Sequence, residues 1–165
     1  MSNYPLGGQT CTPIQTYEEK AHPQEKVSAP APFSAPDRIT PVTIRGNSVL
    51  VPVTLTYGRN EVSAQLLLDT GATGTTIHTE TAERLSINMS GAKKLKGKVV
   101  GGGAIEAHMI RISSLKVGPY TFENHDIFIV PHDGPAAKFD GLLGMDLLRE
   151  LKFKLDFDRQ AIIWE

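Results

Sequence analysis

The sequence predicts a mainly β domain, closed on itself like a barrel and carrying one or two short helices. Short apolar segments with period-two alternation recur along most of the chain, and Gly, Pro, Asn and Asp separate them. Only two short stretches have helical spacing instead. With 165 residues, the chain fits one domain with an appended segment rather than two domains.

The appended segment is expected over residues 1–41. It contains most of the chain's 11 prolines, and its apolar residues follow no regular period. Proline lacks a backbone donor and biases the preceding residue toward extended dihedral angles, which disfavours a helix. Such a composition is typical of a linker or a disordered tail. The folded domain is therefore expected over residues 42–165, with its start near residues 39–44.

The first two strands of the domain are expected to form a hairpin. Apolar residues at every second position predict a strand over 49–57. Residues 58–61 are typical of a hairpin connection, after which 62–68 continue in extended form. This second strand ends in three leucines, Leu66 to Leu68, and is apolar on both faces. It is therefore expected in the centre of a sheet.

Two short helices and several further strands are expected in the rest of the domain. The first helix is expected over 80–85, with Thr79 as its N-terminal cap. The second is expected over 145–151, where leucines have helical spacing. The further extended segments are 94–112 around Gly101-Gly102-Gly103, 115–122 with a turn at Gly118-Pro119, 126–130, 153–157 and 161–164.

Composition narrows the classes of function. A formal net charge of −1 gives no field that would attract nucleic acid or an anionic membrane surface. Cys11 is the only cysteine, which excludes an intrachain disulfide and a dithiol redox centre. No window reaches the roughly 18 apolar residues that span a bilayer, and the N-terminus lacks the pattern of a secretory signal. The chain as given is expected to be soluble and, by default, cytoplasmic. It would be periplasmic or membrane-anchored if an N-terminal anchor was removed.

The residues with the clearest chemistry lie between Leu66 and Ile77. Asp69 directly follows a buried apolar strand, where contact with bulk water is limited. Gly71 allows main-chain donors to approach that carboxylate, and the hydroxyl groups of Thr70 and Thr73 can tie the loop down. Hydrolysis of a peptide bond without a metal or a covalent intermediate needs one group that takes a proton from water and another that gives a proton to the carbonyl oxygen. Two carboxyl groups that share one proton can do both.

Two segments of the chain resemble a known family. Asp69-Thr70-Gly71-Ala72, preceded by three leucines, is similar to the active-site loop of retropepsin-like aspartic proteases. Residues 141–148, Gly-Leu-Leu-Gly-Met-Asp-Leu-Leu, are similar to the later hydrophobic-hydrophobic-Gly segment of that family. Residues 81–85 and the glycine-rich hairpin fit its bacterial members. The resemblance covers about residues 45–165 and leaves the tail unexplained.

The resemblance implies a retropepsin-like acid-protease fold and a role for each matching residue. Asp69 would be the catalytic acid and base, and Thr70 would hydrogen-bond across a two-fold axis to the loop of a partner subunit. Gly71 and Ala72 would line the cleft floor, and Thr73 would support the loop. A flap over the substrate would be formed by Gly101, Gly102 and Gly103. A brace behind the loop would be formed by Leu142, Leu143 and Gly144. Viral members have a charged residue soon after that last glycine, whereas this chain has Met145-Asp146, so their dimer salt bridge is not carried over.

A single Asp-Thr-Gly in a chain without an internal repeat implies a homodimer. Asp133-Gly134 and Asp140-Gly141 lack the hydroxyl residue between the acid and the glycine, so neither supplies a second half. A symmetric dimer brings Asp69 against its own copy. Two carboxyl groups about 3 Å apart cannot both ionise, a coupling for which aspartic proteases are themselves the standard example.

Several residues also have other readings. Gly101 to Gly103 could cradle a phosphate, although the Lys-Ser/Thr of a P-loop is missing. His125-Asp126 and His132-Asp133 suggest a metal cluster, but a spacing of seven on an extended chain points the two histidines to opposite faces. No metal or other cofactor is therefore expected. In structural terms, His78 and His108 are expected as surface or core groups, and Asp146 is expected to cap or begin the short helix. Ile162, Ile163 and Trp164 are expected either in the core or at a dimer seam.

These observations lead to the hypothesis of an aspartic endopeptidase that cleaves a peptide or protein substrate. Its water would be activated by two Asp69 carboxyl groups, one from each subunit of a homodimer. The alternative is a non-catalytic dimeric module on the same fold that binds peptides or regulates a partner. A protease that cleaves its own tail is a third possibility, because an extended segment offers accessible backbone. Nucleic acid and membranes are not expected as partners.

Overall fold

The computed structural model describes residues 38–98, 104–132 and 138–165, which form a mainly β structure with two short α-helices. The helices are α1 (Thr79–Arg84), the 3-10 helix η2 (Met89–Gly91) and α2 (Met145–Leu148). The strands are β1 (Ile39–Pro41), β2 (Thr43–Arg45), β3 (Ser48–Tyr57), β4 (Asn60–Leu68), β5 (Thr76–His78), β6 (Lys93–Lys98), β7 (Ala104–Arg111), β8 (Ser114–Val117), β9 (Tyr120–Glu123), β10 (Asp126–Val130), β11 (Gly141–Leu143), β12 (Phe153–Asp156) and β13 (Ala161–Trp164). The predicted fold class is confirmed.

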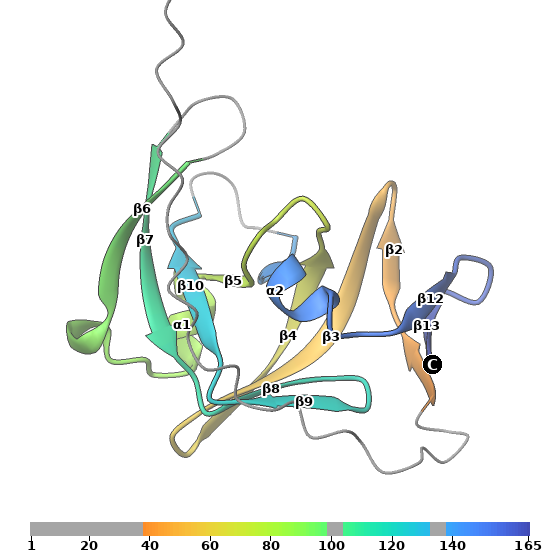
Figure 1. Cartoon of the computed structure of the whole chain (residues 1–165), viewed down its shortest axis with the longest axis horizontal. Coiled ribbons are helices and arrows are strands. Elements are labelled where there is room, and N and C mark those ends of the chain that lie inside the picture. The colour runs from red at the N-terminus through yellow and green to blue at the C-terminus, as the bar shows by residue number, and fades with distance from the viewer. Residues whose placement is uncertain (1–37, 99–103, 133–137) are drawn as a thin grey trace, which may run out of the picture.

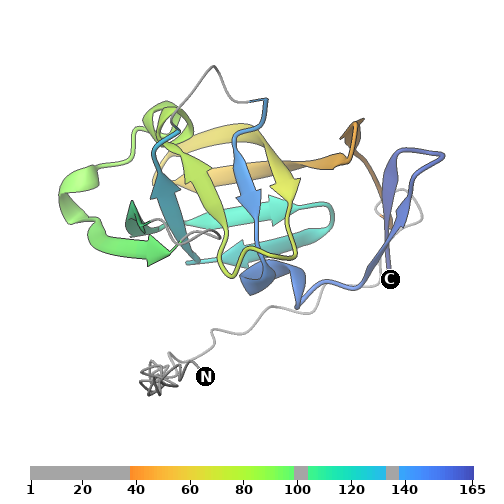
Figure 2. The same ribbon diagram turned by 90° about the horizontal axis from the view of Figure 1, so that it is seen from above.

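The strands belong to two sheets (Figure 1). The larger sheet has the order β6-β7-β10-β5-β11-β4-β3-β8-β9, and β2 pairs with β3 beside this path. The smaller sheet has the order β1-β13-β12. Figures 1 and 2 place the β6–β7 hairpin and the β12–β13 hairpin at opposite ends of the molecule. None of the helices in the described residues is long and apolar enough to cross a bilayer.

The first hairpin confirms the two strands predicted around the turn. β3 and β4 pair in antiparallel register from Leu50 opposite Leu67 to Tyr57 opposite Asn60. The strands are longer than expected, and the connection is reduced to two residues. Gly58 has a φ of +61° in this turn, a conformation that glycine adopts without strain. β4 lies between β3 and β11, so the strand with three leucines is central, as its apolar faces predict.

The helices differ in detail from the expectation. α1 begins at Thr79, and its N-cap is His78, which makes no side-chain capping hydrogen bond, so the prediction of Thr79 as the cap is wrong. α2 is shorter than the predicted 145–151. After Leu148 the backbone tightens, because the N–H groups of Glu150 and Leu151 donate to carbonyl groups three residues earlier.

The C-terminal strand packs as core within the chain. Ile162 and Trp164 are each 1% exposed, which favours the core reading over a dimer seam for these two residues. The indole Nε1 of Trp164 donates to Thr40 Oγ1 at 2.8 Å, and the ring lies edge-on to Tyr120. The smaller sheet is thus joined to β9 and to the start of the described chain. The division of the sequence at residue 41 stays a prediction.

Candidate active site

Asp69 is the first residue after β4 and begins a loop of residues 69–75, named here the Asp69 loop. The backbone N–H of Asp69 donates to the carbonyl of Leu143 at 3.1 Å. The N–H of Gly71 donates to Asp69 Oδ1 at 2.8 Å, and the N–H of Ala72 donates to the Asp69 carbonyl at 3.2 Å. The carboxylate therefore has a fixed orientation that is set by its own loop.

The Asp69 loop is open to solvent on one side and closed on the other. The side chain of Asp69 is half-buried, and Thr70, Gly71 and Thr73 are exposed. Thr75, at the end of the loop, is 0% exposed. A carboxylate on a rigid, partly open loop can meet a ligand or a second protein surface without a large rearrangement.

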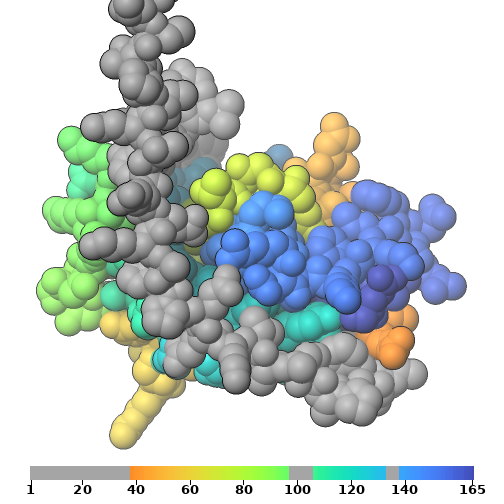
Figure 3. Space-filling view, viewed as in Figure 1, coloured from red at the N-terminus to blue at the C-terminus, as the bar shows by residue number. Residues whose placement is uncertain are grey.

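β11 lies directly behind the Asp69 loop. It is parallel to β4, with Leu142 opposite Leu67 and Leu143 opposite Leu68, and antiparallel to β5. The residues predicted to brace the loop, Leu142, Leu143 and Gly144, are thus brought to it from the far end of the domain. Figure 3 shows the yellow-green segment that includes the loop lying against the blue segment of α2.

Gly144 makes the closest approach to the Asp69 loop. Its N–H donates to Thr75 Oγ1 at 3.1 Å, and the next N–H, from Met145, donates to the Ala72 carbonyl at 2.8 Å. A Cβ at residue 144 would lie 2.5 Å from the carbonyl carbon of Gly74, which is backbone and has no room to move. The absence of a Cβ at Gly144 therefore allows the two backbone segments to pack in direct contact.

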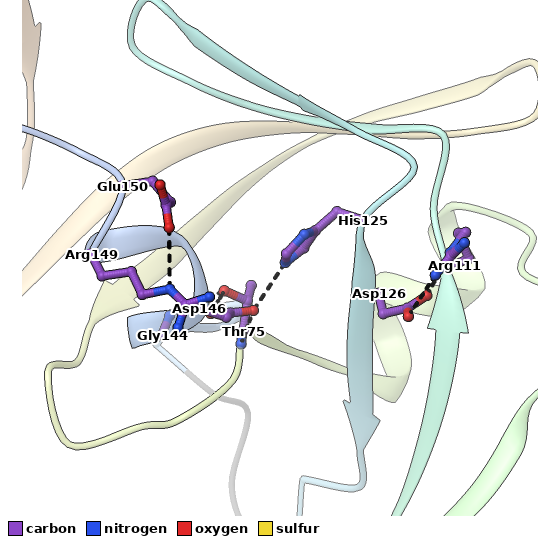
Figure 4. A network of polar contacts seen from close by, with 8 residues as sticks. All are labelled: Thr75, Arg111, His125, Asp126, Gly144, Asp146, Arg149 and Glu150. Atoms are coloured by element: carbon purple, nitrogen blue, oxygen red, sulfur yellow. Dashed lines mark hydrogen bonds and ion pairs between the residues drawn. The ribbon is translucent and has the colours of Figure 1, made fainter. Parts of the chain in front are cut away.

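Asp146 lies in the first turn of α2, as one of its two predicted roles requires, but it does not cap this helix. The N-cap of α2 is Gly144, and the carboxylate of Asp146 accepts from the Thr75 N–H at 2.9 Å and from the Thr75 hydroxyl at 2.8 Å (Figure 4). It also accepts from His125 Nε2 at 3.0 Å. Burial alone would raise the pKa of Asp146, but the hydrogen bonds from His125 and Thr75 outweigh burial and hold the pKa below its ordinary value.

Thr75, Asp146 and His125 are the site residues that sequence reasoning missed. They come from the end of the Asp69 loop, from α2 and from the residue before β10, so no local spacing links them. The single available signal was the acid that follows the brace glycine by two residues. Because Asp146 lies only two residues after Gly144, the segment that brings Gly144 to the loop also brings Asp146 there.

The other histidines lie away from Asp69. His78 is buried and stacks on His132, with ring centroids 4.8 Å apart. Burial, followed by the charge of His132, lowers the pKa of His78. His108 is half-buried on β7. Within residues 38–98, 104–132 and 138–165, no group of three or more His, Cys, Asp or Glu side chains is arranged to hold a metal ion.

The predicted flap residues Gly101, Gly102 and Gly103 lie outside the described residues. β6 and β7, on either side of them, form an antiparallel pair from Lys93 opposite Met109 to Lys98 opposite Ala104. The hairpin predicted around these glycines is thus present up to its last described pair.

A shallow hollow of about 450 Å³ lies on another part of the surface. It is lined by β3, β4 and β8 together with Arg84 and Asp140, which are paired with each other at 2.6 Å. None of its lining residues belongs to the Asp69 loop. The hollow is therefore separate from the Asp69 loop.

Comparison with known proteins identifies the family to which this chain belongs. A sequence model of the aspartyl protease family matches residues 51–147, a span that contains most of β3, the Asp69 loop, β11 and most of α2. The chain belongs to the aspartyl protease family. The predicted resemblance to retropepsin-like members is confirmed. A search of curated proteins finds no match.

Solved structures confirm the fold of this aspartyl protease family member. A retropepsin-like aspartic protease from Rickettsia conorii matches with a TM-score of 0.58 and 24% identity, over 76% of this chain and 87% of that one. The retroviral protease-like domain of Ddi1 from Leishmania major matches with a TM-score of 0.51 and 20% identity, over 73% of this chain and 90% of that one. At these identities the likeness establishes the retropepsin-like fold.

Proposed function

We propose that the protein is an aspartic endopeptidase that works as a homodimer, with Asp69 of each subunit in one shared site. The observation that carries the proposal is the Asp69 carboxylate itself. One of its oxygens accepts from Gly71 at 2.8 Å, and the loop that holds it is half-exposed in front and braced by β11 behind. Membership of the aspartyl protease family supports peptides as the substrate class.

The chemistry requires two carboxyl groups that share one proton. The ionised group takes a proton from water, and the oxygen of that water forms a bond to the scissile carbonyl carbon. The protonated group gives its proton to the carbonyl oxygen. When the tetrahedral intermediate collapses, the carbon–nitrogen bond breaks and the nitrogen leaves with a proton from the dyad. No residue of the chain forms a covalent bond to the substrate in this scheme.

The exposed front of the Asp69 loop supports a second subunit as the source of the other carboxyl group. Thr70 and Gly71 are exposed next to a half-buried Asp69. An isologous two-fold contact at this position would place each Asp69 beside its copy, with Thr70 hydrogen-bonded across the axis. Thr73 and Ala72 would complete the loop and the cleft floor, and the hairpin of β6 and β7 would cover the substrate as a flap.

The test is cleavage of a peptide library by wild type and by Asp69→Asn, from about pH 3 to about pH 8. We expect the variant to lose nearly all activity, because an amide can neither accept nor release the required proton. Asp158→Asn is the matched control, since it makes the same chemical change in an exposed turn and should retain activity. Cleavage by Asp69→Asn at the wild-type rate would refute the proposal.

Binding of the same library peptides, measured beside their cleavage, separates the enzyme from a peptide-binding module. If wild type binds library peptides without cleaving them at any pH, the non-catalytic alternative is correct. Retention of peptide binding by Asp69→Asn, with loss of cleavage, is the result that the protease proposal requires.

A further inference from the structure

The Asp69 loop is held at its buried end by a chain of hydrogen bonds through Thr75. The N–H of Gly144 donates to Thr75 Oγ1 at 3.1 Å, and that hydroxyl donates to Asp146 Oδ1 at 2.8 Å. The Thr75 N–H donates to Asp146 Oδ2 at 2.9 Å. Thr75 is completely buried, so water does not replace these partners when one of them is lost. The position of the loop end therefore depends on where the Asp146 carboxylate points.

His125 sets that direction from a third element. Its Nε2 lies 3.0 Å from Asp146 Oδ2, and because an ionised carboxylate only accepts, the ring N–H is the donor. The backbone of His125 is fixed by the Ile112 N–H, which donates to its carbonyl at 2.9 Å. The ring lies 6.2 Å from that of Phe122. The imidazole, whose side chain is 24% exposed, is thus held in a defined place beside α2.

We propose that His125 is a positioning residue for the catalytic loop, which acts by donating to Asp146 and so keeping that carboxylate aimed at Thr75. This inference rests on the proposed peptidase function of Asp69. His125 does not contact Asp69 itself, and its effect passes through Asp146 and Thr75. Figure 4 shows how His125, just before β10, points toward Asp146, which in turn contacts Thr75.

The other charged groups near this bond are already paired with one another. Arg111 holds Asp126 through two bonds of 2.8 Å and 2.9 Å on the far side of β10. At the end of α2, Arg149 Nε lies 3.2 Å from Glu150 Oε1. Among the described residues, His125 is thus the side chain whose ring nitrogen lies within hydrogen-bonding distance of Asp146, and Nε2 donates to that carboxylate when it carries the ring proton.

The hydrogen bonds between Thr75 and Asp146 depend on pH, because Asp146 must be ionised to accept them. The pKa of Asp146 is lower in the folded chain than its ordinary value. These bonds are therefore complete at a pH above the ordinary pKa and are lost as the pH falls through the pKa of the folded chain. Removal of His125 takes away one of the hydrogen bonds that lower this pKa. The loop is then expected to loosen at a higher pH on the acid side than in wild type.

The experiment compares His125→Phe with His125→Gln. Phenylalanine keeps a ring beside Phe122 but removes the donor, whereas the glutamine amide places an N–H near the position of Nε2. In full-length protein, we expect kcat of His125→Phe to fall by about ten- to a hundredfold with KM little changed, because a small displacement of the catalytic loop affects the chemical step more than binding. The acid limb of its kcat profile should move to higher pH. His125→Gln should recover most of the loss.

A second readout does not depend on activity. Amide hydrogen exchange at Thr75 should be about tenfold faster in His125→Phe than in wild type, and close to wild type in His125→Gln. Asp126→Asn is the control for the same region, because it breaks a surface pair at the next residue and leaves the bond to Asp146 intact. It should change neither the Thr75 exchange nor the acid limb.

The outcomes distinguish the two proposals. If wild type cleaves peptides and His125→Phe matches it in kcat and in Thr75 exchange, the positioning role is overturned and the peptidase stands. A glutamine variant no better than phenylalanine also overturns it, because the donor would then be irrelevant. If wild type cleaves nothing but Thr75 exchange responds as expected, the peptidase proposal fails and the role of His125 in holding the loop stands.

Discussion

At Gly144, the geometry of the Asp69 loop depends on the absence of a Cβ atom. An added Cβ would lie 2.5 Å from the Gly74 carbonyl carbon and 2.9 Å from the Thr75 nitrogen. Both are backbone atoms of the Asp69 loop, so relief would require the loop to move. At the same position, the Gly144 N–H donates to Thr75. Packing and hydrogen bonding therefore constrain the loop at one point.

We expect Gly144→Ala to lower the free energy of unfolding by about 1–3 kcal/mol, the usual penalty for overpacking a rigid site. Peptidase activity should fall further than the loss of folded protein explains, because the displaced segment carries Asp69. Urea unfolding and cleavage rates measure the two effects. Gly91→Ala is the control, since a Cβ there meets no described atom within 4 Å. Equal stability and activity for the two variants would contradict the tight contact.

At the scale of elements, the turn between β8 and β9 is packed against the last strand. Gly118 has a φ of +53° in this turn, and a Cβ would lie 2.4 Å from the Trp164 ring. Gly58, between β3 and β4, has a φ of +61°, and a Cβ there meets nothing within 4 Å. The two turns share the backbone conformation and differ in what surrounds them.

Gly118→Ala is therefore expected to destabilise the protein by at least about 1 kcal/mol more than Gly58→Ala, because both variants carry the strain of a positive φ and only the first displaces a buried ring. Trp164 is the only tryptophan, so its fluorescence reports the site directly. The emission of the folded state should change in Gly118→Ala and not in Gly58→Ala. Similar unfolding midpoints for the two variants would show that the ring is not confined by the turn.

Local patterns in the sequence were enough to predict most elements. Alternation predicted β3 and β4, and glycine with proline predicted the turn between β8 and β9. Reasoning from local patterns fails where the surrounding chain decides the role of a residue. Thr79 has the chemistry of a cap, but the chain enters α1 directly from β5, and His78 occupies the cap position.

The candidate site was also predictable only where its residues belong to local patterns. Asp69 and Gly144 belong to short motifs, so their types and neighbours identify them. The link from His125 through Asp146 to Thr75 exists only because three distant segments meet in the fold. No spacing rule relates residues that contact one another across a sheet and a helix, so sequence reasoning assigned Asp146 to the nearest helix end.

At the scale of the whole molecule, the proposal requires two chains for one site. A mixture of wild type with an equal amount of Asp69→Asn, left to exchange subunits, should contain wild-type pairs as about a quarter of its dimers. Its activity should then fall to about half of that of the same wild-type concentration alone. An unrelated protein added at the same concentration should have no effect. Unchanged activity after exchange would mean that each chain carries a complete site.

The position of β11 between β4 and β5 has a consequence for the order of events during synthesis. Asp69 leaves the ribosome long before Leu143, whose carbonyl receives its N–H, and before Gly144 and Asp146, which hold the end of its loop. A nascent chain that ends before β11 thus contains the acid without its support. Under the proposed function, the fold delays a competent catalytic loop until nearly the whole domain has been made, and unfinished chains would not cut their neighbours.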